Sequence, residues 1–146
     1  MPVTNLAELD ALVARVKAAQ KEFANFPQEK VDEIFRAASL AASTARIELA
    51  KMAATESGMG IMEDKVIKNH FASEFIYNKY KDELTCGIID RNDEGGTITI
   101  AEPLGIVCAI VPTTNPTSTA LFKPLLFLKT RNGGSASPHP PAKHQP

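Results

Sequence analysis

The feature that most constrains this chain is the run Ile106-Val107-Cys108-Ala109-Ile110-Val111, which carries no charged, hydroxyl or amide side chain. A strand that is apolar on both faces is typical of a parallel sheet with helices covering each side. The polar residues 112–119 follow this run. Residues 120–129 then have the composition of a helix, despite Pro124, which would kink it or cost about 3 kcal/mol. Strand, polar turn and helix form half of a βαβ unit, which predicts an α/β fold.

The first half of the chain has the apolar spacing of helices. Residues 5–26 carry apolar side chains at three- and four-residue steps, and Asn5 followed by Glu8 resembles a capping box. Pro27 ends this helix and can open the next one, because a proline in the first turn gives up no needed N–H group. The second helix is rich in alanine and is expected to stop at Ser57-Gly58-Met59-Gly60.

A third helix is expected before residue 84, and a hairpin after it. The predicted buried stripe of this helix is apolar and consists of Val66, Ile67, Phe71, Phe75, Ile76 and Tyr80. Its predicted exposed side is charged and contains Lys65, Lys68, Glu74 and Lys79. Beyond it, residues 97–100 alternate strictly between threonine and isoleucine after the turn cluster 91–96, which predicts a β-hairpin.

The last residues differ in composition from the rest of the chain. Residues 133–146 are rich in Gly, Ser, Pro and His and show no apolar periodicity, so burial cannot order them. We therefore expect one structured unit, residues 1–132, followed by a disordered tail, residues 133–146.

Composition and charge exclude several classes of protein. With 146 residues, 44% of them hydrophobic, the chain has the size and apolar content of one globular domain. The formal net charge is -1 and no block of like charge stands out, so neither a nucleic acid nor a membrane is an expected partner. The start of the chain lacks a signal-peptide pattern, and its two cysteines have no metal-binding spacing. These features predict a cytoplasmic protein.

The polar turn after the apolar run is the candidate binding site. In open α/β sheets, ligands bind beyond the carboxyl ends of strands, where loops meet helix N-termini. The Asn115 carboxamide and the Thr113 and Thr114 hydroxyls can hydrogen-bond a ligand there, and Thr117 or Ser118 could cap the helix. The glycine-rich dinucleotide fingerprint is absent. An ordinary turn with an N-cap explains the same residues, and the pattern leaves both interpretations open.

The remaining chemical groups form no catalytic set. His70 is a lone histidine on the third helix, and His139 and His144 are an isolated pair in the proline-rich tail. Cys86 has no base that the sequence makes evident, and Cys108 lies in the apolar run. We therefore assign no catalytic residue and no metal ligand within this chain.

Several long stretches, in order, resemble the N-terminal part of one enzyme family. These stretches are residues 4–38, 56–83, 96–123 and 128–132, and they include "ESGMGIMEDKVIKNHF" and "GTITIAEPLGIVCAIVPTTNPTST". They are similar to the CoA-acylating acetaldehyde dehydrogenase domain of the bifunctional aldehyde-alcohol dehydrogenases. The likeness runs almost unbroken from residue 2 to residue 132.

The resemblance implies a reaction and a cofactor. Enzymes of this family interconvert acetyl-CoA plus NADH with acetaldehyde, CoA and NAD during fermentation, and their second, alcohol dehydrogenase domain uses iron. It implies an aldehyde dehydrogenase fold, with helices, a hairpin and then the first strand, turn and helix of a Rossmann-like NAD-binding domain. It also implies a homo-oligomer, with a hairpin like residues 97–105 used in subunit assembly. The residues expected to line the NAD site are Ile110, Val111, Pro112, Thr113, Thr114 and Asn115.

The sequence departs from the family at two points. The catalytic cysteine of the family matches neither Cys86 nor Cys108, so we expect no turnover from this chain alone. Gly133-Gly134-Ser135-Ala136 also stands where the family has an apolar strand, and these residues are poor strand formers. We therefore expect a truncated or defective form of the domain. The alternatives are a non-catalytic interaction or oligomerisation fragment, a non-functional remnant, or an independent helical domain.

Overall fold

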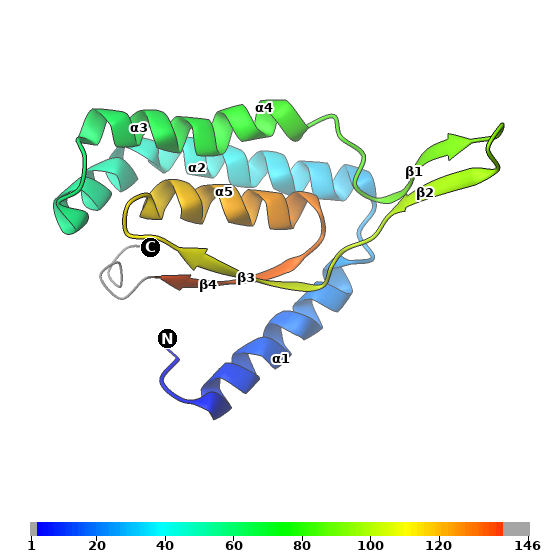
Figure 1. Cartoon of the computed structure of the whole chain (residues 1–146), viewed down its shortest axis with the longest axis horizontal. Coiled ribbons are helices and arrows are strands. Elements are labelled where there is room, and N and C mark those ends of the chain that lie inside the picture. The colour runs from blue at the N-terminus through cyan, green and yellow to red at the C-terminus, as the bar shows by residue number, and fades with distance from the viewer. Residues whose placement is uncertain (1–2, 139–146) are drawn as a thin grey trace.

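The computed structural model describes residues 3–138 (Figure 1). Its elements, in chain order, are α1 (Leu6–Phe23), α2 (Gln28–Ser57), α3 (Met62–His70), the π-helical turn η1 (Phe71–Phe75), α4 (Ile76–Tyr80), β1 (Gly87–Asn92), β2 (Thr97–Ala101), β3 (Ile106–Val111), α5 (Pro116–Lys129) and β4 (Gly133–Pro138). The expected order of helices, hairpin, strand, turn and helix is confirmed.

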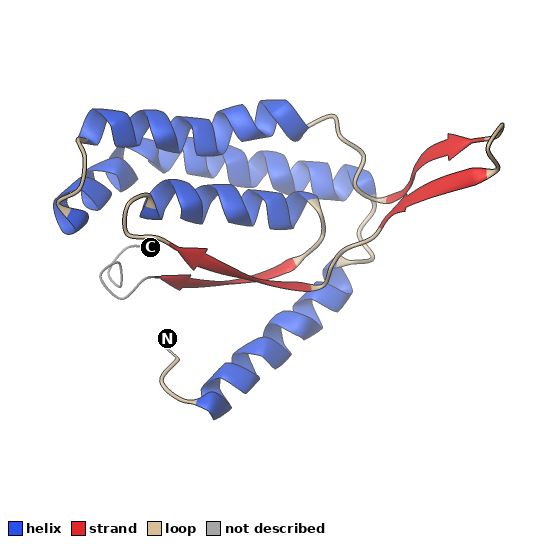
Figure 2. Ribbon diagram, in the orientation of Figure 1, coloured by secondary structure: helices blue, strands red, loops and turns tan. Residues whose placement is uncertain are grey.

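The elements form layers around α5. Helix α2 packs against α3 and α5, and α5 lies along one face of the sheet formed by β3 and β4 (Figures 1 and 2). Helix α1 lies on the other side of the sheet and contacts β4 and β3. The antiparallel hairpin of β1 and β2 projects away from these layers, and nearly all its residues are exposed. The core therefore lies between α2, η1 and α5.

The helix ends follow the local signals in the sequence. Asn5 is the N-cap of α1, and its Oδ1 accepts a hydrogen bond from the Glu8 N–H at 3.0 Å. The Glu8 carboxylate reaches Thr4, whose N–H and hydroxyl both donate to it, and these bonds lower the pKa of Glu8. Helix α2 ends at Ser57, and its C-cap Gly58 has a φ of 61°, a left-handed conformation that glycine adopts without steric cost.

The predicted apolar stripe of the third helix is wrong over much of its length. Ile67, Phe71 and Phe75 are 66%, 53% and 59% exposed, whereas Lys65, predicted on the exposed side, is only 5% exposed. The face turned to α2 and α5 consists of Lys65, Asn69, Ala72, Ser73 and Ile76. Small side chains allow close helix approach. Hydrogen bonds satisfy the polar groups, such as Asn69 Nδ2 to the Arg46 carbonyl at 3.0 Å.

The apolar run forms a parallel strand, as predicted. Strand β3 pairs with β4 in register from Ile106 opposite Gly133 to Val111 opposite Pro138. Ala109 and Val111 are buried beneath α5, but Ile110 on the opposite face is 69% exposed. The face of β3 opposite α5 is therefore only partly covered, and α1 meets the sheet beside Gly133.

Strand β4 corrects the prediction of disorder for residues 133–138. Its backbone forms a ladder with β3, and backbone hydrogen bonding requires no apolar side chain. Phe127 of α5 occupies the space that a side chain at Gly134 would fill, since a Cβ there would overlap its ring. Helix α5 thus supplies the apolar volume that the strand lacks. Residues 139–146 of the predicted tail lie outside the described residues.

Two buried cations fix the end of α5. Lys129 is 2% exposed, and its Nζ lies 2.5 Å from Oδ1 of Asp32 on α2. Arg131 donates through Nη1 to the Ala24 carbonyl at 2.6 Å and through Nη2 to the Ala101 carbonyl at 3.0 Å. These contacts tie α1, α2 and the base of the hairpin to the end of α5.

Candidate functional site

The predicted polar loop lies between the end of β3 and the start of α5. Helix α5 begins at Pro116, with Asn115 as its N-cap residue. The expectation that Thr117 or Ser118 would cap the helix is wrong, because both lie inside it. The Thr117 hydroxyl is buried and donates to Asn69 Oδ1 at 2.9 Å, which fixes the first turn of α5 against α3.

The six predicted site residues differ in exposure. Val111 is buried beneath α5, and the Ile110 carbonyl accepts a hydrogen bond from Lys123 Nζ at 2.8 Å. Pro112 and Thr114 are exposed, whereas Thr113 and Asn115 are half-buried. The loop therefore presents apolar surface from Ile110 and Pro112 together with polar groups from the residues that follow.

Two lysines of α3 lie against this loop. Lys68 Nζ donates to Asn115 Oδ1 at 2.9 Å, and Lys65 Nζ approaches the Thr114 carbonyl at 3.4 Å. The sequence did not identify either residue as part of the site; the predicted exposed side is wrong for Lys65 and right for Lys68. Their contacts join positions 47 and 49 residues apart, and no local pattern identifies such partners.

Burial lowers the pKa of Lys65. Its side chain is 5% exposed, and burial disfavours the charged ammonium form. The neighbouring charge of Lys68 acts in the same direction, so the pKa of Lys65 is lowered by burial first and by Lys68 second. One buried and one exposed lysine of α3 thus lie beside the loop.

A groove of about 540 Å³ opens beside Asn115. It lies between α3, η1 and the first half of α5, and most of its wall is apolar. Its lining residues are Ile67, Lys68, Phe71, Ala72, Asn115, Ser118, Thr119 and Phe122. The exposed aromatic and aliphatic side chains of α3 and η1 therefore face a concave surface that meets the loop at Asn115.

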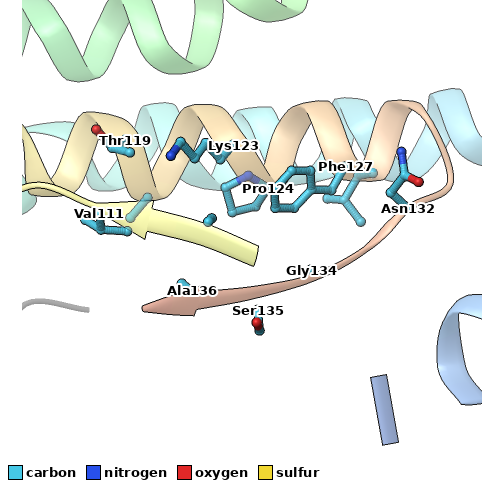
Figure 3. A pocket seen from close by; sticks show the side chains of 12 residues that line it. Val111, Thr119, Lys123, Pro124, Phe127, Asn132, Gly134, Ser135 and Ala136 are labelled. Carbon is cyan, nitrogen blue, oxygen red and sulfur yellow. The ribbon is translucent and has the colours of Figure 1, made fainter. Parts of the chain in front are cut away.

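A second hollow, of about 270 Å³, lies between α5 and the sheet (Figure 3). Val111, Lys123, Pro124 and Phe127 are among the residues on its wall, and Gly134 and Ala136 line the strand side. Phe127 fills the space directly above Gly134, and the hollow is the part between α5 and β4 that remains. Of the six predicted site residues, Val111 lines this hollow and Asn115 lines the groove, and Thr119 of α5 lines both.

The other candidate residues do not join the site. Cys86 is half-buried, Cys108 is exposed on β3, and neither lines the groove. His70 is exposed and lies 3.5 Å from the Glu74 carboxylate. Within residues 3–138, no three His, Cys, Asp or Glu side chains are grouped to hold a metal ion. His139 and His144 lie outside the described residues.

No helix in the described part of the chain combines the length and the apolar character that crossing a bilayer requires.

The layers around α5 and the loop at the end of β3 are those of an α/β fold. Residues 1–133 match the aldehyde dehydrogenase family, and the chain belongs to that family. It is 72% identical over 143 residues to the bifunctional aldehyde-alcohol dehydrogenase of Escherichia coli K12. The matching segment covers 98% of this chain and 16% of that protein. The aldehyde-alcohol dehydrogenase of Clostridium acetobutylicum is 64% identical over the same share of this chain.

Solved structures show the same fold. An acetylating aldehyde dehydrogenase from Geobacillus thermoglucosidasius matches with a TM-score of 0.91 and 43% identity, over 94% of this chain and 30% of that one. A probable aldehyde dehydrogenase from Listeria monocytogenes matches with a TM-score of 0.90 and 44% identity. The expected fold class and family are thus confirmed. The chain spans about one sixth of the length of the first curated relatives.

Proposed function

We propose that the loop Ile110 to Asn115 is one wall of the NAD site of a CoA-acylating acetaldehyde dehydrogenase. The reaction would convert acetyl-CoA and NADH into acetaldehyde, CoA and NAD in the cytoplasm. The observation that carries this proposal is the position of the loop at the carboxyl end of a parallel strand, with Asn115 at the edge of an apolar groove. The membership of the chain in an enzyme family supports it.

The residues of the loop fit a dinucleotide. Exposed surface from Ile110 and Pro112 can contact the flat face of a ring, and the Thr114 hydroxyl can hydrogen-bond a ribose or an amide. Val111, buried beneath α5, holds the loop in place. When bound, NADH supplies the hydride that reduces the acyl group. The chain itself provides the surface that orients the cofactor.

We assign to Asn115 the role of hydrogen-bonding the substrate carbonyl that reacts. Its NH₂ group can donate a hydrogen bond to an oxygen that gains negative charge, which is the usual role of a carboxamide in an acyl-transfer site. The groove beside it has an apolar wall from Ile67, Phe71 and Phe122 that suits a short acyl chain.

The chain does not supply the nucleophile. Cys86 and Cys108 lie away from the groove, and neither matches the catalytic cysteine of the family. We therefore expect the purified 146-residue chain to show no acetyl-CoA-dependent oxidation of NADH. In the proposed enzyme, iron belongs to the alcohol dehydrogenase domain, and the exposed hairpin of β1 and β2 is available for subunit assembly.

A chimera tests this function. Residues 1–132 of this chain would replace the matching segment of the Geobacillus thermoglucosidasius acetylating aldehyde dehydrogenase, which shares its fold. We expect the chimera to reduce acetyl-CoA with NADH, and Asn115→Ala to lower its kcat by about 100-fold or more, as for loss of other oxyanion donors. The matched control is Asn78→Ala, since Asn78 is exposed on α4. A folded chimera without activity, or an Asn115→Ala variant with unchanged kcat, contradicts the proposal.

A further inference from the structure

Lys68 of α3 reaches across to the loop and contacts Asn115, the residue assigned to the reacting carbonyl. Its Nζ lies 2.9 Å from Asn115 Oδ1, which is a normal hydrogen-bond distance. We propose that Lys68 is a positioning residue that fixes the Asn115 carboxamide with its oxygen toward α3 and its NH₂ group free for the substrate oxygen. This inference rests on the function proposed for Asn115.

The chemistry of the lysine decides which way the carboxamide points. An ammonium group has three donors and no acceptor, so the atom that faces it must be the carboxamide oxygen. The NH₂ group is then turned toward Thr114, whose Oγ1 lies 3.4 Å away, at the long end for a hydrogen bond. The two N–H donors therefore have no strong acceptor in the loop and remain for a ligand.

Helix α3 is placed to hold this arrangement. Asn69, next to Lys68, is fully buried and links the start of α5 to α2, through the Thr117 hydroxyl and the Arg46 carbonyl. Lys65, one turn earlier, lies against the Thr114 carbonyl. Three residues of one helix thus contact residues 114, 115 and 117. The base of the Lys68 side chain is therefore fixed relative to the carboxamide.

The charge of Lys68 also favours the proposed role. A hydrogen bond from an ammonium is stronger than one from a neutral donor, and it draws electrons from the carboxamide oxygen. The NH₂ group consequently becomes a better donor. Lys68 and Asn115 both line the groove, so the positive charge lies near the place where the substrate oxygen would become negative.

Nuclear magnetic resonance on the whole 146-residue chain tests this inference without cofactor or turnover. The readouts are the order parameter of the Asn115 side-chain N–H groups and the ¹³Cγ shift of the carboxamide. In Lys68→Met we expect the order parameter to fall below about 0.6, the range of flexible groups, and the ¹³Cγ resonance to move upfield. In Lys68→Arg, which keeps a charged donor, both should remain near the values of the unchanged chain.

The matched control is Lys79→Met, since Lys79 is an exposed lysine of α4 that takes no part in the groove. Backbone order at residue 115 should stay the same in all variants, because Lys68 is exposed and its role is confined to the side chain. An Asn115 side chain that is equally ordered in the unchanged chain and in Lys68→Met would overturn the inference. A fall of the Asn115 side-chain order parameter in Lys68→Arg as large as in Lys68→Met would also overturn it. If the chimera is inactive but the order parameters change as expected in Lys68→Met and Lys68→Arg, the result contradicts the proposed function and leaves the Lys68 contact supported.

Discussion

At the scale of single residues, the buried amine of Lys65 lowers the stability of the fold. Lys65 is almost fully buried, yet its Nζ has only a 3.4 Å contact with the Thr114 carbonyl and a second lysine nearby. A desolvated charge with such weak compensation destabilises a fold. Lys129 shows the contrast, because its buried Nζ lies 2.5 Å from the Asp32 carboxylate. The charge of Lys65 is therefore compensated less well than that of Lys129.

Replacing Lys65 with methionine should stabilise the chain. The variant keeps the apolar stem and removes the charge, so we expect the free energy of unfolding at pH 7 to rise by about 1 kcal/mol. Because the pKa of Lys65 is lowered in the fold, the unfolded state binds more protons at pH values between that pKa and 10.5. Stability of the unchanged chain therefore rises with pH in this window, and the advantage of Lys65→Met shrinks.

Urea unfolding at pH 7 and at about pH 10 checks this prediction, with Lys79→Met as the exposed control expected to change stability by less than about 0.5 kcal/mol. A destabilised Lys65→Met variant, or an advantage that grows with pH, would show that the Lys65 charge supports the fold.

Among the elements, β4 shows that a strand can form without strand-forming side chains. Its backbone pairs with β3 over six positions, and Phe127 of α5 occupies the space above Gly134 (Figure 3). The sequence predicted disorder here because propensity describes side chains, whereas pairing depends on a neighbouring strand. The packing partner, seven residues earlier on a helix, gives no pattern that would identify it.

A double-mutant cycle tests the coupling of these two residues. Gly134→Val should destabilise the chain by about 1–3 kcal/mol, because the new side chain collides with the Phe127 ring. In a Phe127→Ala background the same change should cost at least about 1 kcal/mol less, since the ring is gone. The control is Ser135→Val, whose position points away from α5. Additive effects of the two changes, measured by urea unfolding, would rule out this packing.

For the whole molecule, the sequence predicts the order of elements and the place of the loop. Apolar spacing and the Asn5 cap locate α1, and the apolar run gives a parallel strand that ends at the candidate site. The buried face of α3 could not be predicted, because its polar residues are satisfied by partners far along the chain, as Asn69 is by Thr117. The contact of Lys68 with Asn115 is hidden for the same reason. Periodicity shows which residues share a face, and it does not show which face another element covers.

For the molecule as a whole, we propose that residues 110–115 form one wall of an NAD site. The most direct measurement is a titration of the ¹⁵N-labelled 146-residue chain with NAD, followed by amide chemical shifts. The chain offers one wall of a site, so the binding should be weak, with a Kd on the order of 1 mM or above. We expect shifts concentrated in residues 110–115 and the first turn of α5. Shifts confined to the hairpin or to the hollow between α5 and the sheet, or no shifts at residues 110–115 at NAD concentrations several times 1 mM, would contradict this proposal.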